Sequence, residues 1–272
     1  VMRAAHEWLY MQYDELNRPI ATGKFTDNTN YNNLSFHATR ADTSIKYPWP
    51  GIYTVDTLTK TFYDYYTWRN GQGNPLSATR STAYDSYLQT ASNSTWPYPQ
   101  SATSQSSATK GMVTGTKTKV LGTSTYLYAV SFYDDKGRVI QTQSTNITTA
   151  TDIALTQYTW TGQPLVNIIK NEKSGTNSQT TVALSQMTYD SLFRVVKVEK
   201  KVSNTKINSG NMPGSWTKIA ENEYDALGQL KKKKIGNAPI DSLKYDYNIR
   251  GWMLGMNRTF VKDTTTTNNY FG

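Results

Sequence analysis

One seven-residue stretch decides the fold, and it reads Tyr133-Asp134-Asp135-Lys136-Gly137-Arg138-Val139. An Asp that follows a strand residue can accept hydrogen bonds from nearby backbone N–H groups, which starts a turn. Gly137, in the fifth position, suits a left-handed backbone conformation better than a residue with a side chain. Arg138 then opens a return strand, whose apolar face resumes at Val139. The stretch therefore predicts a tight β-hairpin.

The same seven positions recur along the chain, which indicates a repeat architecture. Four further copies align with the first, and a degenerate copy has Thr in place of Asp. The four are Tyr13-Asp14-Glu15-Leu16-Asn17-Arg18-Pro19, Tyr189-Asp190-Ser191-Leu192-Phe193-Arg194-Val195, Tyr224-Asp225-Ala226-Leu227-Gly228-Gln229-Leu230 and Tyr245-Asp246-Tyr247-Asn248-Ile249-Arg250-Gly251-Trp252, and the degenerate one is Tyr158-Thr159-Trp160-Thr161-Gly162-Gln163-Pro164-Leu165. Two isolated pairs, Tyr63-Asp64 and Tyr84-Asp85, lack the rest of the pattern and can be chance occurrences.

Each position of the repeat has a predicted structural role. Tyr ends a strand and packs against the neighbouring hairpin with its hydroxyl towards water, and Asp accepts from N–H groups one or two residues on. Phe193 and Ile249 hold the fifth position of their copies, so those copies either turn differently or carry strain. The predicted repeat-turn residues are Tyr13, Asp14, Asn17, Tyr133, Asp134, Gly137, Arg138, Tyr189, Asp190, Arg194, Tyr224, Asp225, Gly228, Tyr245, Asp246 and Gly251.

Between the turns lie short runs of Val, Ile, Thr and Tyr, which are typical of strands. We expect strands at residues 126–133, 139–143, 153–160, 165–170, 182–189, 194–202 and 218–224. No long stretch repeats apolar residues at helical spacing. The sequence therefore predicts an all-β strip of repetitive hairpins, in which stacked hairpins bury one another's faces because a single hairpin is barely stable in water.

The domain organisation is predicted to be one repeat segment over residues 1–272. Residues 77–118 are dense in Ser, Thr, Gln and Ala, and we expect a low-complexity insertion or long loop there. The best-defined repeats are expected over residues 119–260.

Composition excludes several classes of protein. The 272 residues include no cysteine and two histidines, His6 and His37, which excludes disulfides, cysteine metal sites and histidine-rich centres. No apolar run approaches the roughly 18 residues of a membrane helix. Aromatic residues make up 12% of the chain, more than a wholly disordered chain would contain. The formal charge of +9 can indicate an anionic partner.

The residues predict no catalytic site, metal site or cofactor. Neither histidine lies in a recognisable triad or metal motif, and we expect both at the surface or at a hairpin edge. The Asp134-Asp135 pair supplies too few oxygens for calcium. The Gly71-Gln72-Gly73 stretch lacks the third glycine of a phosphate-binding loop. Most Tyr-Asp carboxylates have a turn role, so we predict that the chain is not an enzyme.

Two surfaces are candidates for binding. The run Lys231, Lys232, Lys233 and Lys234 predicts either a site for nucleic acid or an acidic cargo, or an edge or lightly buried return strand, where Lys also blocks strand aggregation. The strand is the preferred interpretation. The aromatic cluster Phe62, Tyr63, Tyr65, Tyr66 and Trp68 predicts either packing on the strip or a stacking platform for a carbohydrate or a base. Packing is the preferred interpretation, and the candidate binding residues there are Phe62, Tyr66 and Trp68.

The repeated motif resembles the RHS or YD-repeat family of large exported bacterial proteins. The resemblance covers residues 126–256 and 8–23, whereas residues 25–118 carry little of it. The segments at residues 131–143 and 243–252 resemble most the branch of the family in Gram-negative bacteria that use type 9 secretion. The resemblance implies a strip of β-hairpins that spirals into a hollow shell around a C-terminal toxin or other variable domain. No shell-closing core or toxin domain is recognisable, so we expect a fragment of a longer chain.

The resemblance further implies a non-catalytic segment of a shell that encapsulates or scaffolds a variable domain. The expected partners are that C-terminal domain, further repeats of the same polypeptide and a secretion machinery, with no nucleic acid. The expected location is extracellular or at the cell surface, reached through the periplasm. One alternative is a cell-surface adhesin or glycan-binding β-repeat protein, exported as secretion-system cargo, and another is a hydrolase with paired carboxylates on an all-β scaffold.

Overall fold

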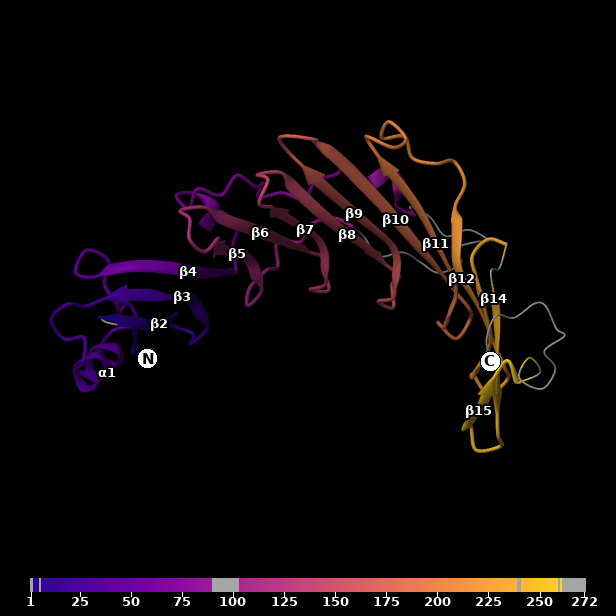
Figure 1. The fold of residues 1–272 in the computed structure, drawn as a ribbon, viewed down its shortest axis with the longest axis horizontal. Helices are drawn as coiled ribbons and strands as arrows, with labels where there is room; N and C mark the ends of the chain where they lie inside the picture. The colour runs from indigo at the N-terminus through magenta and orange to yellow at the C-terminus, as the bar shows by residue number, and fades with distance from the viewer. Residues whose placement is uncertain (1, 5, 90–102, 239–240, 259, 261–272) are drawn as a thin grey trace. The chain divides into compact units, whose positions relative to one another are not determined.

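The computed structural model describes residues 2–4, 6–89, 103–238, 241–258 and 260 (Figure 1). These residues form fifteen β-strands, one α-helix and two short 3-10 helices, so the predicted all-β fold is confirmed. The strands are β1 (Met2–Ala4), β2 (Glu7–Tyr13), β3 (Pro19–Thr26), β4 (Thr54–Tyr63), β5 (Val113–Lys119), β6 (Tyr126–Tyr133), β7 (Val139–Thr145), β8 (Thr151–Tyr158), β9 (Pro164–Lys173), β10 (Gln179–Tyr189), β11 (Val195–Asn204), β12 (Thr217–Tyr224), β13 (Leu230–Ile235), β14 (Asp241–Tyr247) and β15 (Met253–Met256). The helices are α1 (Leu34–Thr43), η1 (Thr67–Arg69) and η2 (Asp85–Tyr87).

The chain folds as two compact units, each built on antiparallel strands. The first unit comprises Val1–Arg80 and Ser104–Asp152, and the second comprises Ser81–Thr103 and Ile153–Gly272. The first contains β1 to β7, and the second contains β8 to β15, except that β8 begins at the end of the first. Within each unit the order of strands in the sheet follows their order in the sequence. Consecutive hairpins therefore lie side by side, as the repeats predict.

A β-bulge lies where a strand that ends in the repeat Tyr meets its turn. The register shifts between Phe132 and Tyr133, so that Tyr133 pairs with Val139. Such a bulge bends the strand and increases its twist. The other pairs at this position are Tyr13–Pro19, Tyr63–Val113, Tyr158–Pro164, Tyr189–Val195, Tyr224–Leu230 and Tyr247–Met253. The Tyr therefore occupies the same place at the end of each hairpin.

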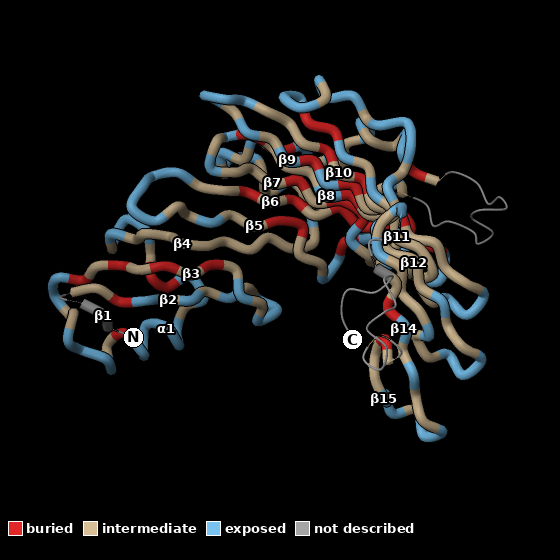
Figure 2. The backbone as a smooth tube through the Cα atoms, turned by 45° about the vertical axis from the view of Figure 1, so that its right-hand side comes forward, coloured by how far each residue is buried: buried red, intermediate tan, exposed pale blue. Residues whose placement is uncertain are grey.

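The helix α1 was not expected from the sequence. Asn33 caps its N-terminus by accepting a 3.0 Å hydrogen bond from the Phe36 N–H, which satisfies a free backbone donor. Its one buried residue is His37, which packs with the aromatic core of the first unit. That core contains Trp8, Phe25 and Tyr47, and buried positions alternate with partly buried ones along β3 (Figure 2).

The second unit has an aliphatic core between β8, β9 and β10. Leu155, Ile168 and Leu184 are almost fully buried there. Leu88 packs against the same cluster, although it precedes these strands by more than sixty residues. The segment before β5 thus contributes to a core and is more than a surface loop.

The insertion between β4 and β5 occupies residues 64–112, which corrects the predicted bounds of 77–118. Its last predicted residues lie in β5, because Val113 begins that strand. Near its start, the Trp68 ring lies directly over Gly115, where a Cβ would be 2.0 Å from a ring carbon. Only glycine at this position lets the ring lie flat against the strand.

Glutamine side chains hold parts of the insertion by its backbone. Gln157, buried in β8, accepts a 2.8 Å hydrogen bond from the Gln89 N–H and donates to the Gln89 carbonyl. Gln105 makes the same pair of bonds within the insertion, with the N–H of Arg80 and the carbonyl of Ala78. A carboxamide has one acceptor and a donor side by side, so it can pair with a backbone segment as a strand does.

Candidate functional site

The candidate site is the repeated turn and its contact with the next hairpin, and it begins with the turn Asp. Asp134 is buried, and its Oδ1 accepts from the N–H of Lys136 at 3.0 Å and of Arg138 at 2.8 Å. The bond to the second residue on is as predicted, whereas the bond to the fourth residue on was not predicted. The same pair of bonds forms at Asp14, Asp190, Asp225 and Asn248. In the degenerate copy, the Thr159 hydroxyl accepts from Gly162 and Gln163.

The fifth position of the turn adopts a left-handed backbone, as predicted. Gly137 has φ of 75° and Gly228 has φ of 85°, while Asn17 has φ of 60°. Phe193 adopts the same conformation, with φ of 61°. The Phe193 copy therefore does not turn differently from the others. It adopts the same turn and carries strain, because a bulky residue at positive φ is unfavourable.

An Arg in the sixth position pairs with the turn Asp. The Arg138 guanidinium lies 2.7 Å from Asp134 Oδ2, and the Arg194 Nε lies 2.6 Å from Asp190 Oδ2. Burial by itself would raise the pKa of Asp190, but hydrogen bonds from the Arg194 backbone and side chain outweigh it and lower the pKa. Bonds from the Arg18 backbone and side chain likewise lower the pKa of Asp14. These carboxylates are therefore held in the charged form.

The Tyr hydroxyl connects each hairpin to the one before it, in a contact that we name the hairpin joint. Tyr133 donates a 2.6 Å hydrogen bond to the carbonyl of Val113, the first residue of β5. The acceptor is always the residue that pairs with the preceding hairpin's Tyr. The other described joints are Tyr63 to Pro19 at 3.1 Å, Tyr189 to Pro164 at 2.6 Å, Tyr224 to Val195 at 3.0 Å and Tyr247 to Leu230 at 3.0 Å. The hydroxyls thus have fixed backbone partners, where the sequence predicted contact with water.

The turn Arg adds a second contact at the joint. The Arg194 guanidinium carbon lies 4.4 Å from the centre of the Tyr224 ring, and that of Arg18 lies 4.3 Å from the Tyr63 ring. A guanidinium over an aromatic face is attracted by the ring quadrupole. The turn Asp orients the Arg, and the Arg covers the Tyr of the next hairpin. Each motif therefore binds its successor.

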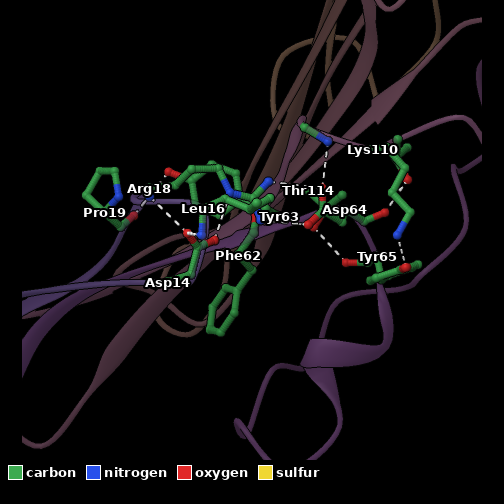
Figure 3. A network of polar contacts seen from close by, with 12 residues as sticks. Asp14, Leu16, Arg18, Pro19, Phe62, Tyr63, Asp64, Tyr65, Lys110 and Thr114 are labelled. Carbon is green, nitrogen blue, oxygen red and sulfur yellow. Dashed lines mark hydrogen bonds and ion pairs between the residues drawn. The ribbon is translucent and has the colours of Figure 1, made fainter. Parts of the chain in front are cut away.

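Tyr63-Asp64 is a true copy of the repeat, with the insertion placed inside its turn (Figure 3). The Asp64 N–H donates to the Met112 carbonyl at 3.0 Å, as the Asp134 N–H donates to the Arg138 carbonyl. Asp64 Oδ1 accepts from the Gly111 N–H at 2.6 Å. The interpretation of this pair as a chance occurrence is therefore wrong. By contrast, Tyr84-Asp85 lies at η2 and forms no hairpin turn.

Asp64 also joins the turn of the preceding hairpin. Arg18 donates to Asp64 Oδ1 at 3.1 Å and to Oδ2 at 2.8 Å, while its Nε bonds Asp14. The Arg18 bonds and the Gly111 N–H lower the pKa of Asp64 to about 2. One guanidinium thus ties two carboxylates from consecutive hairpins, and Figure 3 shows Arg18 between them.

The last copy begins two residues later than predicted. Tyr247 pairs with Met253 across the bulge, and the Asn248 N–H donates to the Trp252 carbonyl at 2.9 Å. Gly251, with φ of 80°, therefore holds the fifth position. Tyr245 and Asp246 lie within β14, so their predicted turn role is wrong. The copy was misaligned because its turn residue is Asn248 and not an Asp.

No family model and no curated protein matches the chain. Among solved structures, it is similar to a chain of the Tc holotoxin pore of Photorhabdus luminescens. The sequence identity is 10% and the TM-score is 0.29. The similarity covers 92% of this chain and 12% of the toxin chain.

The aromatic candidates pack against the first unit and against one another. Phe62 and Trp68 stack with ring centres 4.0 Å apart and nearly parallel. Tyr66 stacks on Phe132, and its hydroxyl donates to the Ser131 carbonyl at 2.9 Å. These contacts occupy the ring faces that a stacking platform would need. Tyr65 differs, because it is 55% exposed.

The lysine run forms β13, which pairs with β12 on one side and β14 on the other. The predicted edge position is therefore wrong, although the partial burial is as expected. Lys234 lies 2.8 Å from Glu223 and 3.8 Å from Glu221, two residues of β12. Lys232 pairs with Glu223 and, on the other side, with Lys244. Lys231 and Lys233 point to the opposite face.

The histidines lie in different surroundings. His6 stacks on Tyr31 at 4.0 Å, near the start of β2. His37 is buried, so the predicted surface position is wrong for it. Its ring bonds the Tyr47 hydroxyl and the Asn30 carbonyl, and it lies 3.8 Å from Asp27. Within the described ranges, no three metal-ligating side chains cluster, and no described helix is long and apolar enough to span a membrane.

Proposed function

We propose that this chain is a non-catalytic structural segment of an RHS/YD-repeat shell, which encapsulates or scaffolds a variable, toxin-like C-terminal domain of an exported bacterial protein. The repeated hairpin joint is the observation that carries this proposal. It supports a structural role because each motif residue is used to hold the strip together. The sequence resemblance, which rests on the same residues, supports the choice of family.

The joint suits a wall built from many small units. In such an array each unit contacts only its neighbours, so stability accumulates from local interfaces. Here each interface repeats a Tyr hydroxyl bond to a fixed carbonyl, and in two described cases a guanidinium covers the ring. A strip joined in this way can be extended by further repeats without new chemistry. The partners that follow are further repeats and the variable domain of the same polypeptide.

The turn carboxylates support the absence of catalysis at the repeats. A catalytic acid or base needs a carboxylate that can reach a substrate. The carboxylates of Asp14, Asp64, Asp134 and Asp190 are instead engaged by backbone N–H groups and by Arg. Export through the periplasm to the cell surface or beyond, including by type 9 secretion, belongs to the proposal through the resemblance alone.

The first experiment is the denatured intact mass of the native species that contains this sequence. We expect a mass far above 30.7 kDa, with a variable domain C-terminal to the repeats. A mass near 30.7 kDa would contradict encapsulation, because so short a strip can hardly close around another domain. The adhesin or glycan-binding alternative would then replace it.

A second experiment tests the wall itself in that native polypeptide. Tyr224→Phe and Tyr133→Phe remove the hydroxyls of two joints, so we expect faster protease cleavage of the variable domain. Tyr13→Phe is the matched control, because the Tyr13 hydroxyl contacts only the Met11 sulfur among the described residues. Equal cleavage in all three variants and the wild type would contradict a protective wall.

A further inference from the structure

A cavity of about 550 Å³ lies in the first unit, within the insertion between β4 and β5. Residues from 64–70, 78–79 and 105–109 line it. Its wall includes Tyr65, Tyr66, Arg69, Thr79, Gln105 and Ser106. The wall thus combines aromatic rings, neutral hydroxyl and amide groups, one guanidinium and the Asp64 carboxylate. Apart from Asp64, none of these groups belongs to a repeat turn or a hairpin joint.

The wall is held in place by contacts with the sheet and within the insertion. Tyr66 stacks on Phe132 with ring centres 5.4 Å apart. The Ser106 N–H donates to the Tyr133 carbonyl at 2.8 Å. Gln105 bonds the backbone at residues 78 and 80. Binding sites for small molecules are usually preformed in this way, because little ordering is then needed on binding.

Arg69 is the basic residue of the wall, and nothing described neutralises it. Its Nε is buried without a hydrogen-bond partner, and no carboxylate of the described residues lies within ion-pair distance. A buried donor without an acceptor is unfavourable. Asp64 lines the same cavity, but its oxygens already accept from Arg18 and Gly111. The Arg69 Nη groups donate to no described residue, so an acceptor from outside the chain would pair with them rather than with the buried Nε.

We propose that this cavity binds a hydroxylated organic monocarboxylate of monosaccharide size, that is, a sugar acid. A guanidinium matches a carboxylate by two parallel hydrogen bonds. One guanidinium balances one negative charge, whereas a phosphate monoester would bring close to two. The hydroxyls of Thr79 and Ser106 supply partners for ligand hydroxyls. Tyr65 lines the cavity with its ring partly exposed, although the Lys110 ammonium lies 4.0 Å from the ring centre, and an aromatic ring offers an amphipathic surface for a sugar.

The cavity volume agrees with this ligand class, since small-molecule sites span roughly 300–1,000 Å³. A sugar acid can come from a cell-surface glycan or from a free metabolite, and the chemistry recognised is the same. Ligand binding in this cavity goes beyond the proposed shell role and does not depend on it. If the titration shows no binding, the shell proposal can still be tested, and the reverse also holds.

The test is isothermal titration of the intact chain with D-glucuronate, D-glucose and D-glucose 6-phosphate. We expect glucuronate to bind at least about 10-fold more tightly than the other two, since they lack a carboxylate. Arg69→Gln should weaken glucuronate binding about 10–100-fold. Arg250→Gln removes the same charge from an exposed turn and should leave binding unchanged. The titration is then repeated with a glucuronate-terminated oligosaccharide. Binding as tight as that of free glucuronate would indicate a glycan end as the ligand, whereas binding of free glucuronate without the oligosaccharide would indicate a free metabolite.

Two results would overturn the proposal: no glucuronate binding to the wild type, or equal binding to the wild type and Arg69→Gln. Tighter binding of glucose 6-phosphate would overturn the carboxylate assignment. If thermal melting shows that Arg69→Gln is unfolded, Ser107→Phe serves instead, because Ser107 lines the cavity and is exposed. The Phe ring should block the ligand, and unchanged affinity would count against the site. A shift of the Arg69 side-chain ¹⁵Nε resonance on adding glucuronate gives an independent readout.

Discussion

The Tyr224 hydroxyl donates a 3.0 Å hydrogen bond to the carbonyl oxygen of Val195. Tyr224 ends β12, and Val195 begins β11 just after the preceding turn. The bond thus connects the entry to one turn with the exit from the turn before it. Because the acceptor is a backbone carbonyl, any residue can occupy its position. The hydrogen bond of the joint therefore depends on one side chain, the Tyr, and on the register that the bulge fixes.

Removing a joint hydroxyl should destabilise the first unit by a measurable amount. Tyr133 is buried and donates at 2.6 Å, so Tyr133→Phe should lower the free energy of unfolding by about 1 kcal/mol. Urea denaturation followed by tyrosine and tryptophan fluorescence measures this. Tyr13→Phe, which removes only a contact to sulfur, should change the value by less than about 0.5 kcal/mol. Equal losses in the two variants would contradict the role of the joint.

Gly228 should not tolerate a β-branched side chain. Its φ is 85°, and an added Cβ would lie 3.3 Å from Arg194 Nη1. Gly228→Val should therefore lower the free energy of unfolding by roughly 1–3 kcal/mol. Gly214→Val is the matched control, because Gly214 has open space around it and no positive φ. A thermal scan in which Gly228→Val melts with the wild type would refute the turn assignment.

Phe193 offers the opposite change, a substitution that stabilises. Its φ of 61° is the conformation that Gly137 and Gly228 adopt in their turns. Phe193→Gly removes the strain and should raise the free energy of unfolding by up to about 1 kcal/mol, less whatever packing the partly exposed ring provides. Differential scanning calorimetry measures the change. A clear loss of stability would mean that the ring's packing outweighs its backbone strain.

The Asp64 carboxylate should make the first unit sensitive to acid. Hydrogen bonds from Arg18 and Gly111 lower its pKa to about 2, below its unfolded value. A carboxyl group with a lowered folded pKa contributes stability above the unfolded pKa and loses it as pH falls towards the folded one. The urea midpoint of wild type should therefore exceed that of Asp64→Asn at pH 7. The difference should shrink between about pH 5 and pH 2.

The control for this pH series is Asp190→Asn, which removes a turn carboxylate in the second unit. Asp190→Asn should also lower the urea midpoint at pH 7, and this difference should shrink as pH falls, since the Asp190 pKa is also lowered. Probes in the first unit, such as Trp68 fluorescence, should respond to Asp64→Asn only. A difference between wild type and Asp64→Asn that stays constant with pH would contradict the charge contribution.

The repeated turns could be predicted from the sequence because their chemistry is local. An Asp, a left-handed fifth residue and a following strand are enough to fix a turn, and the strand at residues 126–133 has the bounds that the pattern predicts. The same reasoning failed where one signal was replaced. Asn248 bonds the turn as Asp does, but the Tyr245-Asp246 pair two residues earlier carries the more familiar pattern.

Contacts between distant segments could not be predicted. The turn that begins at Asp64 closes at Met112, and no local spacing reveals that closure. The acceptors of the hairpin joints are backbone carbonyls, which every residue type has, so the sequence does not reveal which residue accepts the bond. The helix α1 buries one residue, His37, so it lacks the apolar stripe by which surface helices are recognised. Burial of His37 follows from tertiary packing alone.

The closure at Asp64 has a consequence for how such chains change over evolution and in the laboratory. The two ends of the insertion lie one hydrogen bond apart, at the same distance as the ends of an ordinary tight turn. The pairing of β4 with β5 thus does not depend on the length of polypeptide between them, because lengthening a loop raises the entropic cost of closing it only slightly. Any turn of this kind can accept a foreign domain with adjacent termini as a graft, and so the hairpin tips are natural points for acquiring new binding functions.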